Sequence, residues 1–310
     1  MRWSWLILAL VPAMVTPAAQ KEQPPQYNVR VNVVSLDVEI LDKAGNPVLN
    51  LAPEDFVVRE DGKKMHLTHF TRLQDRPVSF AVVLDTSAIS LDKLVAAKDF
   101  IFQLIHLLGR KDDICLYTFD SRDARLEQDF TQDRGLLVDA LENISVPSHH
   151  SGGILAELLG PDPKTALGID LALINLRKAQ NPKKALLVVS NRFRGLGPAT
   201  VDHVQNFGFT LLTLGFSNKA ALLVTLGGDY ISRKQLMRES GGRQFSADTE
   251  NTTGVCRAIA YSLKNYYGIS YLTQIGPNDE KPRHIVVQVP GHDYVINARR
   301  TYNPKLQQGG

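Results

Sequence analysis

The chain has 310 residues, of which 44% are hydrophobic and 22% are charged, and its formal net charge is +3 at pH 7. This hydrophobic content is ordinary for a globular protein, and the length suggests one large or two modest domains. The small net charge gives no support to a nucleic-acid partner, and none is expected. Only two cysteines occur, too few for a disulfide framework; Cys115 and Cys256 lie in apolar patterns and are predicted to be buried thiols.

The first 19 residues are predicted to be a secretory signal peptide. A basic start precedes the apolar run Trp5–Val15, and small residues around Ala18 and Ala19 suit cleavage. The apolar run is too short to span a bilayer comfortably, and no other stretch approaches the roughly 20 apolar residues of a membrane helix. The alternative is an uncleaved N-terminal anchor. We expect an exported protein with no membrane span after signal removal.

Residues 28–72 are expected to form a small antiparallel β unit. Apolar and polar residues alternate from Val34 to Ile40, which predicts a half-buried strand, and the opposite phase before it predicts a bulge near Val33. Asp61-Gly62 is a hairpin dipeptide that should join a strand ending at Glu60 to one over Lys64–Thr68. A unit of about 45 residues with few large apolar groups does not easily stand alone, so it needs a partner sheet.

Strands and helices alternate over residues 77–266. This order predicts a three-layer, Rossmann-like α/β domain with a mostly parallel sheet covered by helices on both faces. The expected strands are Phe80–Asp85, Asp113–Phe119, Ala185–Val189 and Phe209–Phe216, with an edge strand over Arg125–Phe130. The expected helices are Leu91–Leu108, Asp133–Ile144, Thr165–Lys178, Ser232–Ser240 and Thr252–Tyr266.

Period-two alternation returns over residues 267–303 and predicts three more antiparallel strands. Because this segment and residues 28–72 are both incomplete β units, we expect them to pack together as one β-sandwich, with the α/β domain inserted between them. Four basic residues lie on or beside these strands: Lys281, Arg283, Arg299 and Arg300. They are expected to form a solvated face or to protect an edge, and the alternative is that they meet an acidic partner.

The candidate site lies where the first buried strand of the α/β domain ends. The apolar run from Phe80 stops at Asp85, and Ser87 follows after one residue. In parallel sheets, ligands collect at the carboxyl ends of the strands, beside the point where the strand order reverses. Carboxylate and hydroxyl oxygens are the ligands that Mg²⁺ prefers. The sequence therefore favours a site for a divalent cation at this edge.

Several motifs together resemble a known family. The Asp-x-Ser element and the β/α order are similar to a von Willebrand factor type A (VWFA) domain, and the wider chain resembles the exported bacterial VWFA-related family. The motifs that carry this resemblance are Asp42–Val48, Leu51–Phe56, Glu60–Gly62, Gln128–Arg134, Ser240–Arg243 and Ala298–Tyr302. The resemblance implies a three-layer α/β domain with a metal-ion-dependent adhesion site at the carboxyl edge of the sheet. The exported protein is expected in the periplasm or outside the cell.

The family's metal pattern is incomplete in this chain. Asp85 and Ser87 fill its first two places, but the third holds Ile89, which has no side-chain oxygen. Thr165 matches the family's threonine, and Asn191 replaces its second aspartate. A degenerate site is expected, at which Mg²⁺ binds weakly or not at all, because a ligand oxygen and a negative charge are both missing. The competing interpretation is that Asp85 only caps the neighbouring loop.

We expect a non-enzymatic binding or adhesion module with a protein partner that the sequence does not identify. One alternative is a metal-dependent, hydrolase-like enzyme that uses Asp85 with His149 or His150; another is a purely structural envelope component. No Gly-x-Ser-x-Gly element or paired acid–base arrangement occurs in the sequence, which argues against the enzyme. The loops over residues 145–164 and 219–231 are given no role.

Overall fold

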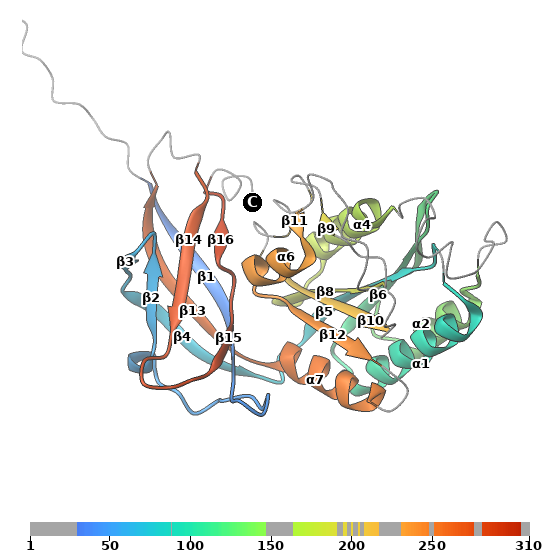
Figure 1. The fold of residues 1–310 in the computed structure, drawn as a ribbon, viewed down its shortest axis with the longest axis horizontal. Coiled ribbons are helices and arrows are strands. Elements are labelled where there is room, and N and C mark those ends of the chain that lie inside the picture. The colour runs from blue at the N-terminus through green and yellow to red at the C-terminus, as the bar shows by residue number, and fades with distance from the viewer. Residues whose placement is uncertain are drawn as a thin grey trace, which may run out of the picture.

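The computed structural model shows a β-sandwich and a three-layer α/β domain (Figure 1). The predicted signal peptide with its cleavage site at Ala18 and Ala19, the pair His149-His150, and Asn191 all lie outside the residues that the structure describes. The described residues are 30–87, 89–146, 164–190, 195–196, 200, 204, 208–216, 231–247, 251–275 and 281–304.

The α/β domain is built on a six-stranded sheet with the strand order β12-β10-β8-β5-β6-β7. All neighbouring strands run parallel except β7, which lies antiparallel to β6 at one edge. The mostly parallel sheet is confirmed, although the sequence did not predict β12. The strands are β5 (Val78–Asp85), β6 (Asp113–Phe119), β7 (Ala124–Thr131), β8 (Lys183–Val189), β10 (Thr210–Phe216) and β12 (Arg243–Ala247).

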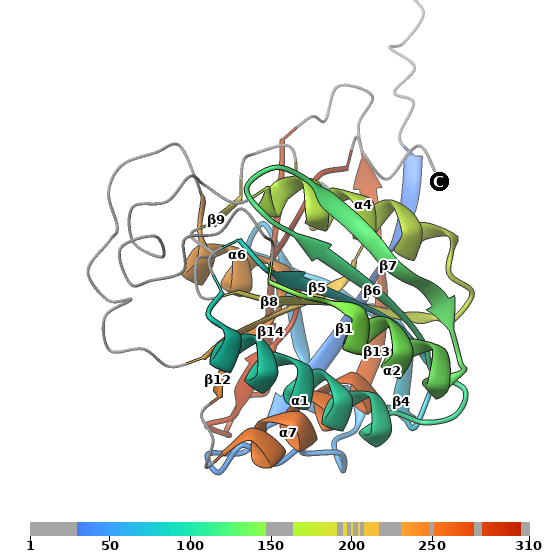
Figure 2. The same ribbon diagram turned by 90° about the vertical axis from the view of Figure 1, so that its right-hand side faces the viewer.

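Helices cover both faces of this sheet, so the domain has three layers (Figures 1 and 2). One apolar core joins the sheet to α1 (Leu91–Leu107), α2 (Arg134–Asn143) and α7 (Thr252–Lys264). A second core joins the opposite face to α4 (Thr165–Lys178) and to Met237 of α6 (Arg233–Ser240). None of the helices in the described part of the chain is long and apolar enough to cross a membrane.

The sandwich consists of two four-stranded antiparallel sheets, β15-β1-β13-β4 and β16-β14-β2-β3. Both contain strands from the two ends of the chain, and their inward side chains share one apolar core. This confirms the predicted additional sandwich, whereas the exact domain boundaries stay a prediction. Its strands are β1 (Arg30–Leu41), β2 (Val57–Glu60), β3 (Lys63–Lys64), β4 (Leu67–Gln74), β13 (Asn265–Ile275), β14 (Arg283–Gln288), β15 (Val295–Asn297) and β16 (Thr301–Tyr302).

In the described residues, three short elements lie outside the large sheets and the α-helices. A 3-10 helix, η1, covers Pro53–Asp55, and a two-stranded sheet pairs β9 (Gly195–Leu196) with β11 (Ile231–Ser232). At the hairpin between β2 and β3, Asp61 has φ 47° and Gly62 has φ 83°. Two consecutive positive φ angles are what a tight two-residue hairpin requires, so the turn predicted from this dipeptide is confirmed.

Three sequence expectations for the sandwich were wrong. β1 pairs with β13 in one continuous register, without a bulge near Val33, because Val31 and Val33 simply lie on the exposed outer face. The strand expected over Lys64–Thr68 is split into β3 and β4, which belong to different sheets. Arg299 is buried: its guanidinium lies over the ring of Tyr302 instead of facing solvent.

The β-sandwich and the α/β domain, called the two bodies below, meet at the amino edge of the parallel sheet. Lys183 begins β8 and its Nζ lies 2.7 Å from Oδ2 of Asp37 in β1. Arg243 begins β12 and its guanidinium lies 3.0 Å from Oε1 of Glu39 in the same strand. In Figure 1 the arrowhead of β12 points away from the sandwich. The carboxyl edge, where the candidate site was expected, is therefore on the far side of the α/β domain.

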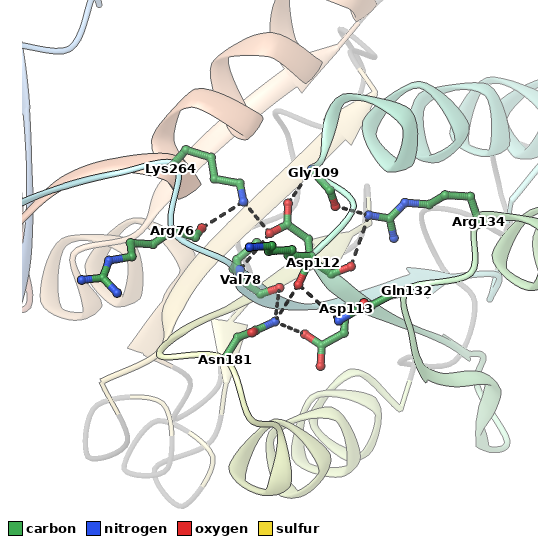
Figure 3. A network of polar contacts seen from close by, with 10 residues as sticks. Arg76, Val78, Gly109, Asp112, Asp113, Gln132, Arg134, Asn181 and Lys264 are labelled. Carbon is green, nitrogen blue, oxygen red and sulfur yellow. Dashed lines mark hydrogen bonds and ion pairs between the residues drawn. The ribbon is translucent and has the colours of Figure 1, made fainter.

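A buried carboxylate lies beside the two chain segments that connect the sandwich to the α/β domain (Figure 3). Asp112 is fully buried, and its oxygens accept hydrogen bonds from the backbone N–H groups of Val78 (2.9 Å) and Gly109 (2.6 Å). Lys264 forms an ion pair with the same carboxylate and also donates to the carbonyl oxygen of Arg76 at 2.9 Å. The chain enters the α/β domain beside Arg76 and leaves it at Lys264. This network therefore fixes both connecting segments.

Candidate functional site

The site begins where β5 ends in Asp85 and Thr86. The Thr86 N–H and hydroxyl both donate to the carbonyl oxygen of Phe119, at 2.8 and 3.1 Å. This ties the end of β5 to the end of β6, its neighbour in the sheet. Asp85, Thr86 and Ser87 are each less than 10% exposed, so the polar residues at this edge are held in fixed positions within the fold.

Asp85 accepts hydrogen bonds at both carboxylate oxygens. The Ser87 N–H donates to Oδ1 at 2.8 Å, and the Ser190 hydroxyl donates to Oδ2 at 2.5 Å. Ser190 directly follows β8, and its N–H donates to the carbonyl oxygen of Leu214 in β10 at 2.9 Å. A buried carboxylate therefore links the ends of β5 and β8, and Ser190 extends this link to β10.

Sequence reasoning missed Ser190. The sequence contained a usable signal, since a hydroxyl residue directly after a buried strand of a parallel sheet lies at the same edge as Asp85. The order of the strands was needed to see that β8 is the direct neighbour of β5. Only this adjacency lets the short side chains of Ser190 and Asp85 meet.

Thr165 lies at the same edge because α4 begins there. It is buried, and the N–H of the preceding Lys164 donates to the carbonyl oxygen of Asp120, the residue after β6, at 2.7 Å. One turn later, Gly168 packs so closely that an added Cβ would lie 3.2 Å from Val83 and 3.1 Å from Phe119. The first turn of α4 is thus held against the ends of β5 and β6.

The third position of the metal pattern contributes to the core instead of the edge. Ile89 packs against the apolar cluster beneath α1. The next residue, Ser90, begins α1: its carbonyl oxygen accepts from the Leu94 N–H, and its hydroxyl bonds the carboxylate of Asp92. This hydrogen bond lowers the pKa of Asp92. Ser90 is therefore engaged with its own helix and does not replace the missing ligand.

The side chains at this edge supply only part of the coordination shell of a divalent cation. Mg²⁺ requires near-octahedral oxygen coordination, and the matched side chains in the described residues are Asp85, Ser87 and Thr165. Asp85, the one carboxylate among them, accepts two internal hydrogen bonds. Across the described ranges, no three His, Cys, Asp or Glu side chains are grouped to hold a metal ion. Asn191, expected to orient a water, lies outside those ranges.

Comparisons with known proteins returned solved structures only. No protein-family model matches the chain, and no curated protein matches it. The chain is similar to the conserved hypothetical protein BatB from Bacteroides thetaiotaomicron, at 17% identity and TM-score 0.45, over 60% of this chain and 98% of that one. An aerotolerance-related membrane protein from Bacteroides fragilis gives 19% identity and TM-score 0.45 over 60% and 98% of the two chains.

A third structure covers a larger share of the chain. It is a von Willebrand factor type A protein from Catenulispora acidiphila, with 12% identity and TM-score 0.43 over 93% of this chain and 77% of that one. At such identities and TM-scores the likenesses carry no conclusion about function. The three layers, and the place of the Asp-x-Ser element at the carboxyl edge of the sheet, are those that the sequence resemblance implied. The chain therefore has a von Willebrand factor type A-like fold joined to a β-sandwich.

Proposed function

We propose that this protein is an exported, non-enzymatic module that binds another protein at the carboxyl edge of its parallel sheet. The observation that carries the proposal is the arrangement of the two bodies. The sandwich contacts the amino edge through Lys183 and Arg243, which leaves the opposite edge facing away from it. Beside that edge, the first two turns of α1 expose Leu91 (69%) and Val95 (58%). Exposed apolar side chains next to fixed polar groups suit a protein interface.

The geometry of Asp85 favours binding over catalysis. A general base must lie within reach of the proton that it abstracts. Asp85 is only 6% exposed, and both of its oxygens already accept hydrogen bonds within the chain, from Ser87 and Ser190. Such a group supports the positions of its neighbours. In the proposed function, Asp85 fixes the shape of the binding edge and takes part in no chemical step.

We further propose that partner binding does not require a metal ion. The described donors lack the third ligand oxygen of the family pattern, and the hydrogen bond from Ser190 already ties Asp85 to the neighbouring strand. The shape of the edge is then set by hydrogen bonds within the chain. On this basis, chelating agents should leave the complex intact.

The binding proposal can be tested by site-specific photo-crosslinking in the source cells. A photo-reactive residue at Leu91, beside the proposed edge, should give a defined protein adduct. The same residue at Val286, which is 47% exposed on the sandwich, is the matched control and should not give that adduct. The Leu91 adduct should weaken when Asp85→Ala is added and persist when EDTA is present.

The crosslinking results also separate the alternatives. A structural envelope component with contacts over its whole surface would give equal adducts from Leu91 and Val286, which would contradict the proposal. A hydrolase-like enzyme would turn over generic ester or phosphate substrates when a divalent cation is supplied, and this turnover would be lost in Asp85→Ala. We expect no turnover above that of the variant.

Export is tested separately. Mass spectrometry of the protein isolated from the source cells should find an N-terminus next to Ala18 or Ala19, as a cleaved signal peptide requires. A chain that retains residues 1–19 would contradict cleavage and favour an N-terminal anchor.

A further inference from the structure

The turn that ends α6 is in direct backbone contact with the segment before β16. Gly241 has φ +71°, and a Cβ added to it would lie 2.3 Å from the carbonyl carbon of Ala298 and 2.5 Å from the nitrogen of Arg299. Beside this contact, the Arg300 N–H donates to the carbonyl oxygen of Glu239 at 2.8 Å. No side chain separates the two backbones at this point.

The two sides of this contact belong to different bodies. Arg300 is part of the sandwich, because its carbonyl oxygen accepts from the N–H of Ile285 in β14 at 2.7 Å. The second glycine of the turn has a different neighbour: a Cβ on Gly242 would lie 1.9 Å from the carbonyl oxygen of Leu211, in β10 of the α/β domain. The missing side chain of Gly241 therefore allows the close contact between the two bodies. That of Gly242 allows close packing within the α/β domain.

Two ion pairs flank the glycine contact. Lys183, whose side chain is 3% exposed, pairs with Asp37 and lies 4.2 Å from the centre of the Tyr266 ring. Arg243, two residues after Gly241, pairs with Glu39, the side chain of which is 8% exposed. Separating the bodies would break both ion pairs, and each charge would then have to be hydrated by water instead.

From these contacts we propose that Gly241 fixes the orientation of the α/β domain on the sandwich, so that the two bodies unfold and tumble as one rigid unit. Polar interfaces between domains generally permit relative motion, because exposed side chains rearrange easily. A backbone-to-backbone contact has no such freedom. A residue other than glycine at this position must push the Ala298 backbone away, which opens the interface. The proposal concerns the fold of the chain and does not depend on what the carboxyl edge binds.

The test uses the full mature chain and three glycine variants. Gly241→Ala should split the single calorimetric transition expected of the wild type into two and increase the radius of gyration measured by small-angle scattering. Gly254→Ala is the matched control, since Gly254 has open space around it, and it should change neither readout. Gly242→Ala should lower the melting temperature of the α/β domain, because its clash with Leu211 is internal.

A second variant tests the same interface if Gly241→Ala does not fold. Lys183→Met removes an ion pair across the same interface and leaves Asp37, which is partly exposed, able to bind water. It should move both readouts in the same direction as Gly241→Ala, by a smaller amount. Two transitions in the wild type, or one transition with an unchanged radius of gyration in the variants that fold, would overturn the proposal.

Discussion

The Ser190 hydroxyl donates a 2.5 Å hydrogen bond to the carboxylate of Asp85, and both residues are buried. They lie at the ends of two adjacent parallel strands, β8 and β5. The bond is an internal connection at the place where the family resemblance implied a metal ion. It accounts for how the polar edge keeps its shape around Asp85.

Loss of this hydrogen bond should destabilise the α/β domain. Ser190→Ala removes the donor and leaves Asp85 with one fewer partner, so the free energy of unfolding should fall by about 1.5–3 kcal/mol, the usual range for a hydrogen bond to a charged group. Urea unfolding measures the change. Ser35→Ala is the control, since Ser35 lies on the exposed face of the sandwich and its loss should cost less than about 0.5 kcal/mol. Equal losses in the two variants would contradict a special role for Ser190.

Mg²⁺ should not stabilise the wild-type protein. A ligand that binds the native state raises the melting temperature, by an amount that corresponds to about 2.7 kcal/mol when it is present at 100 times its dissociation constant. The double variant Ile89→Ser, Asn191→Asp restores the two missing family ligands and should gain a shift with Mg²⁺ that EDTA reverses. A shift of the same size in the wild type would show that three oxygens suffice.

The stability of the protein should fall at alkaline pH, in part because of Tyr117. Burial raises the pKa of its hydroxyl from 10.0 to about 12. Between about pH 10 and pH 12 the unfolded chain ionises this tyrosine while the folded chain keeps it neutral, so stability is lost as pH rises. The full loss from this residue is at most about 2–3 kcal/mol.

The Tyr117 contribution is isolated by comparing wild type with Tyr117→Phe in urea unfolding at about pH 8 and about pH 11. The wild type should lose more stability between the two values than the variant does. Tyr261→Phe, a change at a tyrosine that is 54% exposed, is the control. Identical pH dependence in wild type and Tyr117→Phe would show that the folded chain ionises Tyr117 as easily as the unfolded chain.

Among the polar contacts at the amino edge, substitutions in the network around Asp112 should lower the stability most (Figure 3). Asp112→Ala removes the acceptor for the N–H groups of Val78 and Gly109 and leaves Lys264 without its buried partner, so it should cost about 3–5 kcal/mol. Lys264→Met should cost less, because both N–H groups keep their acceptor. Asp99→Ala, at an exposed carboxylate on α1, is the control. A larger loss in Lys264→Met than in Asp112→Ala would contradict this order.

Much of the secondary structure was predictable because the local patterns are strong. The predicted helix over Thr165–Lys178 has the observed bounds, and the hairpin at Asp61-Gly62 forms as expected. The predictions that were wrong depend on contacts between residues that are distant in the sequence. Val31 and Val33 carry the same alternation whether a bulge is present or the strand simply has an exposed apolar face. Arg299 looks like any surface arginine until the ring of Tyr302 and the carbonyl oxygen of Ser35 are placed around it.

By itself, the sequence determined the α/β order, the incomplete β units at each end and the position of Asp85 at the carboxyl end of a buried strand, because periodicity and turn chemistry are local properties. Only the tertiary structure decided that Ser190 is the partner of Asp85 and that Gly241 lies against Ala298. Both pairings depend on which strands and segments become neighbours in space. That choice is made by burial of the shared apolar cores, to which residues from the whole chain contribute.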